Sequence, residues 1–258
     1  MIKVNLCSLL LVSTFLGILL PSCSKSVDYT PKVAVTDTVA KTVNLNLISK
    51  LLVSPEMSSI VCTGSNRTLG TDSFFSYPHQ LRALLDSDNV TNVSVYNAGV
   101  DWAMVDYLTS LVSTQLTPNF LSKGQNVAIV WEIDEDLYEN RTDISTYYQR
   151  YITYCKALQA GGWQVISVTT PYRNVSYLSG GDYSQSGFDT LEYDSVASNI
   201  DEYIRQFWPQ FSSGLADLAA DGRLNHYDSI YFQADHWNLT AEGNRAVAQD
   251  VLLTMQNN

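Results

Sequence analysis

Three residues of the sequence could together perform acyl transfer. Ser65 lies on a short turn, between the apolar run 60–62 and a polar stretch that favours the start of a helix. A serine in such a turn can act as a nucleophile if a neighbouring base takes its proton. Far along the chain, Asp235 and His236 supply a carboxylate and an imidazole, the groups that complete a Ser-His-Asp triad. Asn66 follows Ser65 directly, and its amide nitrogen is not nucleophilic.

These residues must be positioned by a fold in which strands and helices alternate. Runs typical of strands occur at 58–64, 93–99, 126–134, 163–172 and 228–233. Segments with helical patterns occur at 76–87, 103–116, 144–162, 197–222 and 239–256, and residues 174–194 are expected to form an excursion loop. Strands separated by helices form a mainly parallel sheet covered on both faces. The sequence therefore predicts an α/β fold with a five-stranded sheet, and ligand sites at the carboxyl ends of its strands.

Four short blocks resemble, in order, the blocks of the SGNH (GDSL-type) hydrolases: IVCTGSNRTLG, YNAGVDWA, WEIDEDLYEN and DHWNLTAEGNRAVA. The resemblance runs from about Ser59 to the C-terminus. It implies a three-layer α/β/α flavodoxin-like fold and, for the family, cleavage of esters and acetyl groups. The positions that match the family's catalytic residues are Asn66 for the nucleophile, Gly99 and Asp136 for the oxyanion hole, Asp235 for the catalytic Asp and Asn238 for the His.

The resemblance implies that this chain has lost the family's chemistry. Asn66 is not a nucleophile, and Asn238 cannot act as a base near neutral pH. A carboxylate at Asp136 would oppose the negative charge that an oxyanion hole must stabilise. The sequence therefore predicts no hydrolysis from these positions.

Two alternatives could restore chemistry. Ser65 and His236, each beside the expected position, could act with Asp235; otherwise Ser65 caps a helix and His236 is an exposed loop residue. The acidic run 132–139 could hydrolyse glycosides, or could hold a cation with Asp134 and Asp136 as weak candidate ligands; otherwise it is a solvated rim. No cofactor is predicted.

Aromatic residues suggest one class of ligand. Trp102 and Trp237 are expected to flank the crevice, where their rings could stack on sugars, although aromatic residues more often belong to a core. The formal net charge of −11 disfavours nucleic acid as a partner. Cys62 and Cys155 could pair in an oxidising compartment or remain buried free thiols.

The N-terminus resembles that of a bacterial lipoprotein. Residues 1–22 have the apolar core of a signal peptide, followed by LPSC, which resembles a lipobox and predicts lipidation of Cys23. Residues 23–46 are expected to be a flexible tether, and 47–258 the SGNH-like domain. A lipid at Cys23 would anchor the domain to the bacterial cell envelope, outside the cytoplasm.

The sequence therefore predicts an extracytoplasmic, lipid-anchored binding module with an impaired hydrolase site, whose ligand is a small molecule or a carbohydrate. The alternative is an active ester or acetyl-glycan hydrolase that uses Ser65, His236 and Asp235, or a carboxylate mechanism.

Overall fold

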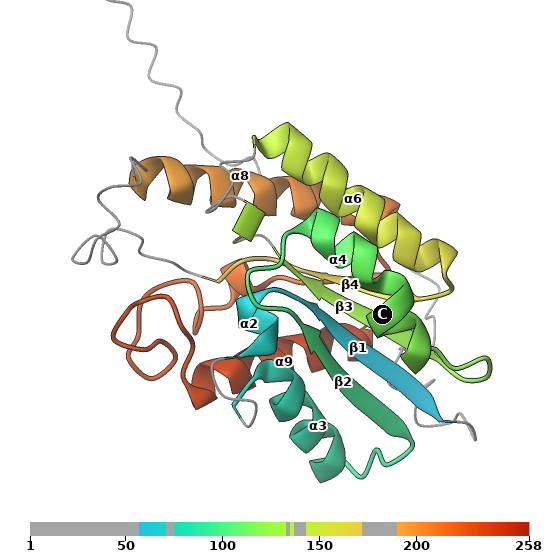
Figure 1. Cartoon of the computed structure of the whole chain (residues 1–258). Helices are drawn as coiled ribbons and strands as arrows, with labels where there is room; N and C mark the ends of the chain where they lie inside the picture. The colour runs from blue at the N-terminus through green and yellow to red at the C-terminus, as the bar shows by residue number, and fades with distance from the viewer. Residues whose placement is uncertain (1–56, 71–74, 133–134, 137–142, 172–189, 258) are drawn as a thin grey trace, which may run out of the picture. The chain divides into compact units, whose positions relative to one another are not determined.

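The computed structural model describes residues 57–70, 75–132, 135–136, 143–171 and 190–257 (Figure 1). The predicted signal peptide, Cys23 and the tether 23–46 lie outside these residues, as does Asp134. Within the described part of the chain, none of the helices has both the length and the apolar composition needed to cross a membrane.

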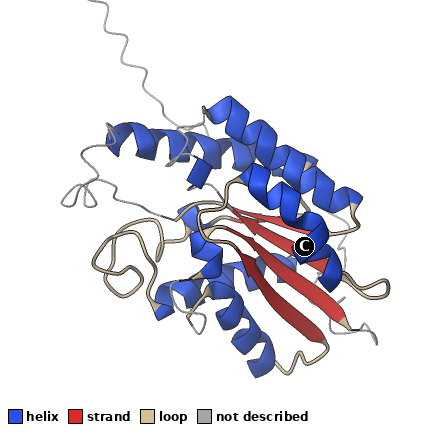
Figure 2. Cartoon of the chain, in the orientation of Figure 1, coloured by secondary structure: helices blue, strands red, loops and turns tan. Residues whose placement is uncertain are grey.

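Five parallel strands form one sheet in the order β2-β1-β3-β4-β5. The strands are β1 (Ser58–Gly64), β2 (Val93–Gly99), β3 (Asn126–Trp131), β4 (Gln164–Val168) and β5 (Gly214–Ala216). The longer helices are α3 (Tyr77–Ser87), α4 (Val105–Leu111), α6 (Ile144–Ala160), α8 (Thr190–Phe207) and α9 (Ala241–Asn257), and α2 (Asn66–Leu69) is a single turn. The sheet lies between the helices, as the predicted three-layer α/β/α fold requires (Figure 2).

Alternate residues of the central strands pack on opposite faces of the sheet. Ile60 and Cys62 of β1 join a core with α3 and α9, whereas Val61 joins a core with α4, α6 and α8. Figure 1 shows these two groups of helices on the two sides of the sheet. Because β1 and β3 are buried along their whole lengths, their apolar residues, 60–62 and 127–131, are consecutive and do not alternate with polar ones, as in other sheets covered on both faces.

The fifth strand lies in a different segment from the one predicted. The expected strand 228–233 is irregular and makes one isolated bridge, between Phe232 and Leu239. The strand that pairs with β4 is β5, which lies inside the expected helix 197–222. That helix ends at Phe207, before a 3-10 turn that contains Pro209. A three-residue strand with a glycine is too short to produce a recognisable alternating pattern.

The two cysteines of the domain are buried free thiols. Cys62 belongs to the core on the α3 and α9 side of the sheet, and Cys155 to the core on the opposite side. The sheet therefore separates them, which excludes the predicted alternative of a disulfide. Burial raises the pKa of each thiol to about 12, so neither is a reactive thiolate near neutral pH.

Two carboxylates share one guanidinium where the loop after β5 meets α9. Arg223 Nη2 lies 2.7 Å from Asp221 Oδ2 and 3.0 Å from Asp250 Oδ1. Burial and the neighbouring Asp221 raise the pKa of Asp250 to about 7. Between about pH 4, where an unfolded Asp titrates, and that value, the folded protein keeps a proton that the unfolded chain has released. The free energy of unfolding should therefore fall as the pH rises through this window.

We expect Asp250→Asn to remove this slope, because an amide does not titrate. At about pH 8 the variant should be more stable than the wild type by up to ~2 kcal/mol, as measured by urea denaturation at several pH values. Asp86→Asn, which removes an exposed carboxylate beside Arg82 on α3, is the matched control and should keep the wild-type slope. An Asp250→Asn variant with the wild-type slope would contradict this assignment.

Candidate functional site

The carboxyl ends of three neighbouring strands meet at one edge of the sheet. Gly64 at the end of β1 pairs in register with Gly99 of β2 and with Trp131 of β3. The chain then turns directly into α2, so Asn66 and Arg67 lie above this edge. This is the edge at which parallel α/β sheets place their ligand sites.

Gly99 allows α2 to lie directly against the end of β2. A Cβ at this position would lie 2.2 Å from Leu69 N and 2.7 Å from the carbonyl carbon of Thr68, both backbone atoms of α2. The N–H of Gly99 donates to Asn97 Oδ1 at 2.9 Å. The amide that the resemblance assigns to an oxyanion hole is therefore engaged within its own strand.

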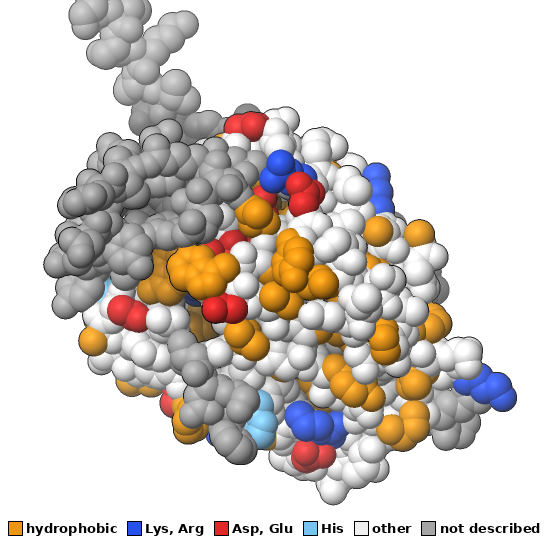
Figure 3. All heavy atoms as spheres, viewed as in Figure 1, with side chains coloured by type: hydrophobic (Ala, Val, Ile, Leu, Met, Phe, Trp, Pro, Cys, Tyr) orange, Lys and Arg blue, Asp and Glu red, His pale blue; other side chains and the backbone are white. Residues whose placement is uncertain are grey.

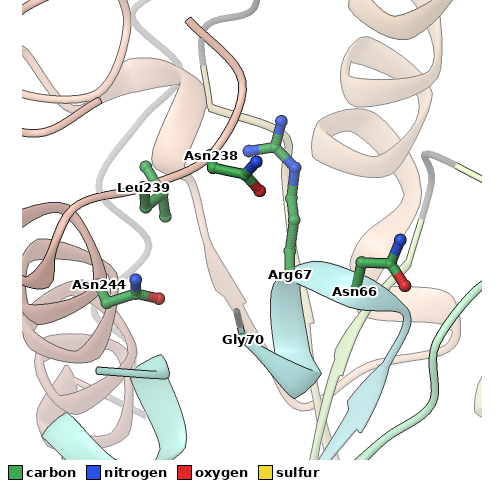
Figure 4. Close-up of a pocket in the computed structure, with 6 residues that line it drawn as sticks. All are labelled: Asn66, Arg67, Gly70, Asn238, Leu239 and Asn244. Carbon is green, nitrogen blue, oxygen red and sulfur yellow. The ribbon is translucent and has the colours of Figure 1, made fainter. Parts of the chain in front are cut away.

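Asn66 and Asn238, which the resemblance assigns to the nucleophile and base positions, line one pocket. It has a volume of about 20 Å³, which is room for roughly one water molecule. The described residues that line it are Asn66, Arg67, Gly70, Asn238, Leu239 and Asn244 (Figure 4). The pocket therefore joins α2 to the segment before α9 and to the first turn of α9, and among these lining residues there is no hydroxyl, imidazole or carboxylate.

Each of these two amides is held by a hydrogen bond. Asn66 Oδ1 accepts from the backbone N–H of Trp102 at 2.8 Å. Asn238 Nδ2 donates to Asp235 Oδ2 at 2.7 Å, while Asp235 Oδ1 accepts from the backbone N–H groups of Trp237 and Asn238. The carboxylate that would orient an imidazole in a hydrolase orients an amide here.

Arg67 lies in the crevice that these residues surround. Its guanidinium carbon is 4.9 Å from the ring centroid of Trp237 and 5.8 Å from that of Trp131, distances typical of cation–π contacts. Arg67 is only 8% exposed, and in Figure 4 its side chain extends between Asn66 and Asn238. Arg67 and Asn244 carry no sequence signal of a site, since a single charged residue in a turn and an amide in a helix form no motif.

Ser65 and His236 contact different residues in the structure. Ser65 is 2% exposed, and it begins α2 without the predicted side-chain cap; its backbone carbonyl accepts from the N–H groups of Thr68 and Leu69. The His236 ring is partly buried and stacks on Tyr227, with centroids 3.6 Å apart. Among the described residues, the structure shows no hydrogen bond between the Ser65 hydroxyl and the His236 ring, and neither residue lines the pocket.

Asp136 differs from its expected role. Its side chain is fully buried, and its carboxylate accepts from the N–H of Val105 at 2.7 Å and from Arg150 Nη1 at 3.1 Å. Burial raises the pKa of Asp136, while these two donors act in the opposite direction. The carboxylate therefore holds the start of α4 and does not line the pocket.

The acidic run shows no cation site in its described part. Glu132 and Asp136 are buried, and Glu132 Oε1 accepts from the N–H of Glu135. Across the described ranges there is no group of three or more His, Cys, Asp or Glu residues that could hold a metal ion. Asp134, the other weak candidate ligand, lies outside those ranges.

The two tryptophans occupy different surroundings. Trp237 is partly buried and covers Arg67, whereas Trp102 is 53% exposed. Tyr107 of α4 is another exposed aromatic residue of this part of the chain. Figure 3 shows hydrophobic side chains on this face of the domain. Trp102 is therefore the tryptophan available to a ligand.

No protein-family model matches the sequence, and no curated protein matches it. Solved structures do match. A lipase/acylhydrolase from Enterococcus faecalis is 14% identical with a TM-score of 0.59, over 78% of this chain and 96% of that chain. A member of the lipolytic G-D-S-L family from Veillonella parvula is 16% identical with a TM-score of 0.54, over 76% and 97%. An acetyl xylan esterase from Geobacillus stearothermophilus is 14% identical with a TM-score of 0.54, over 80% and 97%. At these identities the likeness confirms the predicted fold.

Proposed function

We propose that this chain, which has the fold of the SGNH (GDSL-type) hydrolases, is a binding module that does not hydrolyse esters. One observation carries the proposal: the two side chains that would have to exchange a proton, Asn66 and Asn238, are amides that line one pocket. Their hydrogen bonds to the Trp102 N–H and to Asp235 give both amides structural roles.

Two further features argue against ester hydrolysis. An oxyanion hole needs N–H groups aimed at the developing negative charge, and the N–H of Gly99 already donates to Asn97. Arg67 extends between Asn66 and Asn238 (Figure 4), so its side chain separates the two positions that the resemblance assigns to the nucleophile and the base. Nucleophile, base and hole donor would all have to be supplied by other residues.

The ligand that fits best is a carbohydrate. The exposed tryptophan Trp102, bonded through its N–H to Asn66, offers a flat apolar surface with a polar side chain beside it, and this combination suits the face of a sugar ring that lies outside the small pocket. The acetyl xylan esterase among the structural neighbours acts, by its name, on a decorated glycan. We propose that this chain binds the same class of molecule and does not cleave it.

Binding to a panel of immobilised neutral glycans tests the proposal. We expect the full chain to bind at least one glycan of the panel. Trp102→Ala should weaken that binding roughly 10-fold or more, because an exposed aromatic anchor contributes 1.4 kcal/mol or more. Tyr203→Ala, which removes an aromatic residue of α8 that is 45% exposed, is the matched control and should bind normally. Wild-type protein that binds no glycan of the panel would contradict the carbohydrate assignment.

We also propose that Cys23 carries the lipid that holds the domain on the cell envelope. The support is the LPSC sequence at the end of the apolar N-terminal run. We expect the full-length chain to incorporate radiolabelled palmitate in a bacterial host and to fractionate with membranes, and Cys23→Ala to do neither. Equal labelling of the Cys7→Ala and Cys23→Ala variants would rule out this site.

A further inference from the structure

Trp102 has a backbone conformation that a large side chain rarely adopts. Its φ is 56°, in the left-handed region, where a bulky non-glycine residue costs of the order of 1 kcal/mol or more. The residue is nevertheless 53% exposed, so burial does not compensate for the strain. Another contact must hold this residue in place.

The contacts that hold Trp102 come from the end of β1 and the start of α2. The N–H of Val100 donates to the carbonyl of Gly64 at 2.9 Å, and Ala103 closes a turn by donating to Val100 at 3.2 Å. At the centre of this turn, the N–H of Trp102 donates to the side chain of Asn66 at 2.8 Å. The strained residue is thus fixed by a side-chain oxygen from another element of the fold.

We propose that Asn66 is a positioning residue, which fixes the exposed indole of Trp102 beside the pocket as a stacking surface for a neutral sugar ring. A serine here would have a shorter side chain, and it could not place a carbonyl oxygen against the Trp102 N–H. The ligand class rests on the proposed function, whereas the positioning of Trp102 by Asn66 stands on the geometry alone.

The amide groups of the pocket indicate an uncharged, hydroxylated ligand. Asn66 Oδ1 accepts from the N–H of Trp102, and Asn66 Nδ2 is a donor that it can offer to a ligand. Asn238 and Asn244 each donate one N–H, to Asp235 and to the carbonyl of Thr240, so each can offer its oxygen and its second N–H. A hydroxyl group both donates and accepts, so it matches this mixed set of amides, while the Arg67 guanidinium that also lines the pocket is engaged by the rings of Trp237 and Trp131.

Tryptophan fluorescence of the ligand-free protein tests whether Asn66 positions Trp102. The signal of Trp102 is obtained by subtracting the spectrum of each variant that also carries Trp102→Phe. We expect Asn66→Ala to shift the emission of Trp102 and to change its quenching by acrylamide. Asn66→Asp keeps an oxygen acceptor and should preserve the wild-type signal; it also provides a folded comparison if Asn66→Ala is unstable. Asn119→Ala, which removes an amide that donates to the nearby carbonyl of Gln115, is the control.

Titration with the neutral oligosaccharide xylotetraose tests whether Trp102 serves as a stacking surface for a neutral sugar. We expect Asn66→Ala to bind about 10-fold more weakly than the wild type. Asn66→Asp should also bind more weakly despite its normal Trp102 signal, because a carboxylate lacks the N–H donor. An unchanged Trp102 signal in Asn66→Ala would overturn the positioning role. A changed signal together with no binding of xylotetraose by the wild type would overturn the neutral-sugar assignment and leave the positioning role supported.

Discussion

The purified chain should release acetate from aryl acetates and from acetylated xylan no faster than buffer alone. Removing the residues of a serine triad costs of the order of 10⁶ in kcat, and under the proposed function Asn66 and Asn238 stand where the nucleophile and the base would be. The loss of one oxyanion-hole donor adds a further factor of roughly 10² or more, since the Gly99 N–H is engaged with Asn97. Acetate release measured by a coupled assay, with an active acetyl esterase as the positive control, checks this expectation.

Single substitutions identify the residues responsible for any acetate release that is observed. Ser65→Ala and His236→Ala should give the same background as the wild type, because Ser65 is buried and His236 stacks on Tyr227. Turnover that disappears in either variant would establish a displaced triad and refute the non-catalytic proposal. Turnover that survives both changes but is lost in Asp136→Ala would instead indicate a carboxylate mechanism.

Gly99→Ala should lower the free energy of unfolding by about 2–3 kcal/mol, a cost typical of overpacking. The added Cβ would lie 2.2 Å from Leu69 N and 2.6 Å from Leu69 Cα, so the backbone of α2 must move. Because α2 carries Asn66 and Arg67, we also expect glycan binding to weaken. Urea denaturation and the glycan panel measure the two effects.

Gly222→Ala is the matched control for this substitution. A Cβ at Gly222 meets nothing within 4 Å, so the free energy of unfolding of Gly222→Ala should match that of the wild type within ~0.5 kcal/mol. If Gly99→Ala and Gly222→Ala have equal stability and equal glycan binding, the contact between α2 and β2 is not tight enough to position the site.

Local sequence patterns determined most of the fold. The apolar runs of β1, β2 and β3 and the helical spacing of α3, α6 and α9 are properties of neighbouring residues, so they could be predicted without coordinates. The segment β5 could not, because it forms a strand only by pairing with β4. The prediction of a strand at 228–233 was wrong for the opposite reason. The apolar residues of this segment resemble a strand, yet Ile230 is 57% exposed.

The identities of the candidate site residues are read directly from the sequence, and through the resemblance they predict amides where a hydrolase needs a hydroxyl and an imidazole. The direction in which each of these side chains points depends on partners that are distant along the chain, and only the tertiary structure decided those directions. Asp136 faces Arg150 and the start of α4, and Asn66 reaches the backbone of Trp102. A polar side chain takes the direction in which its hydrogen bonds are satisfied, and those partners are brought together by packing.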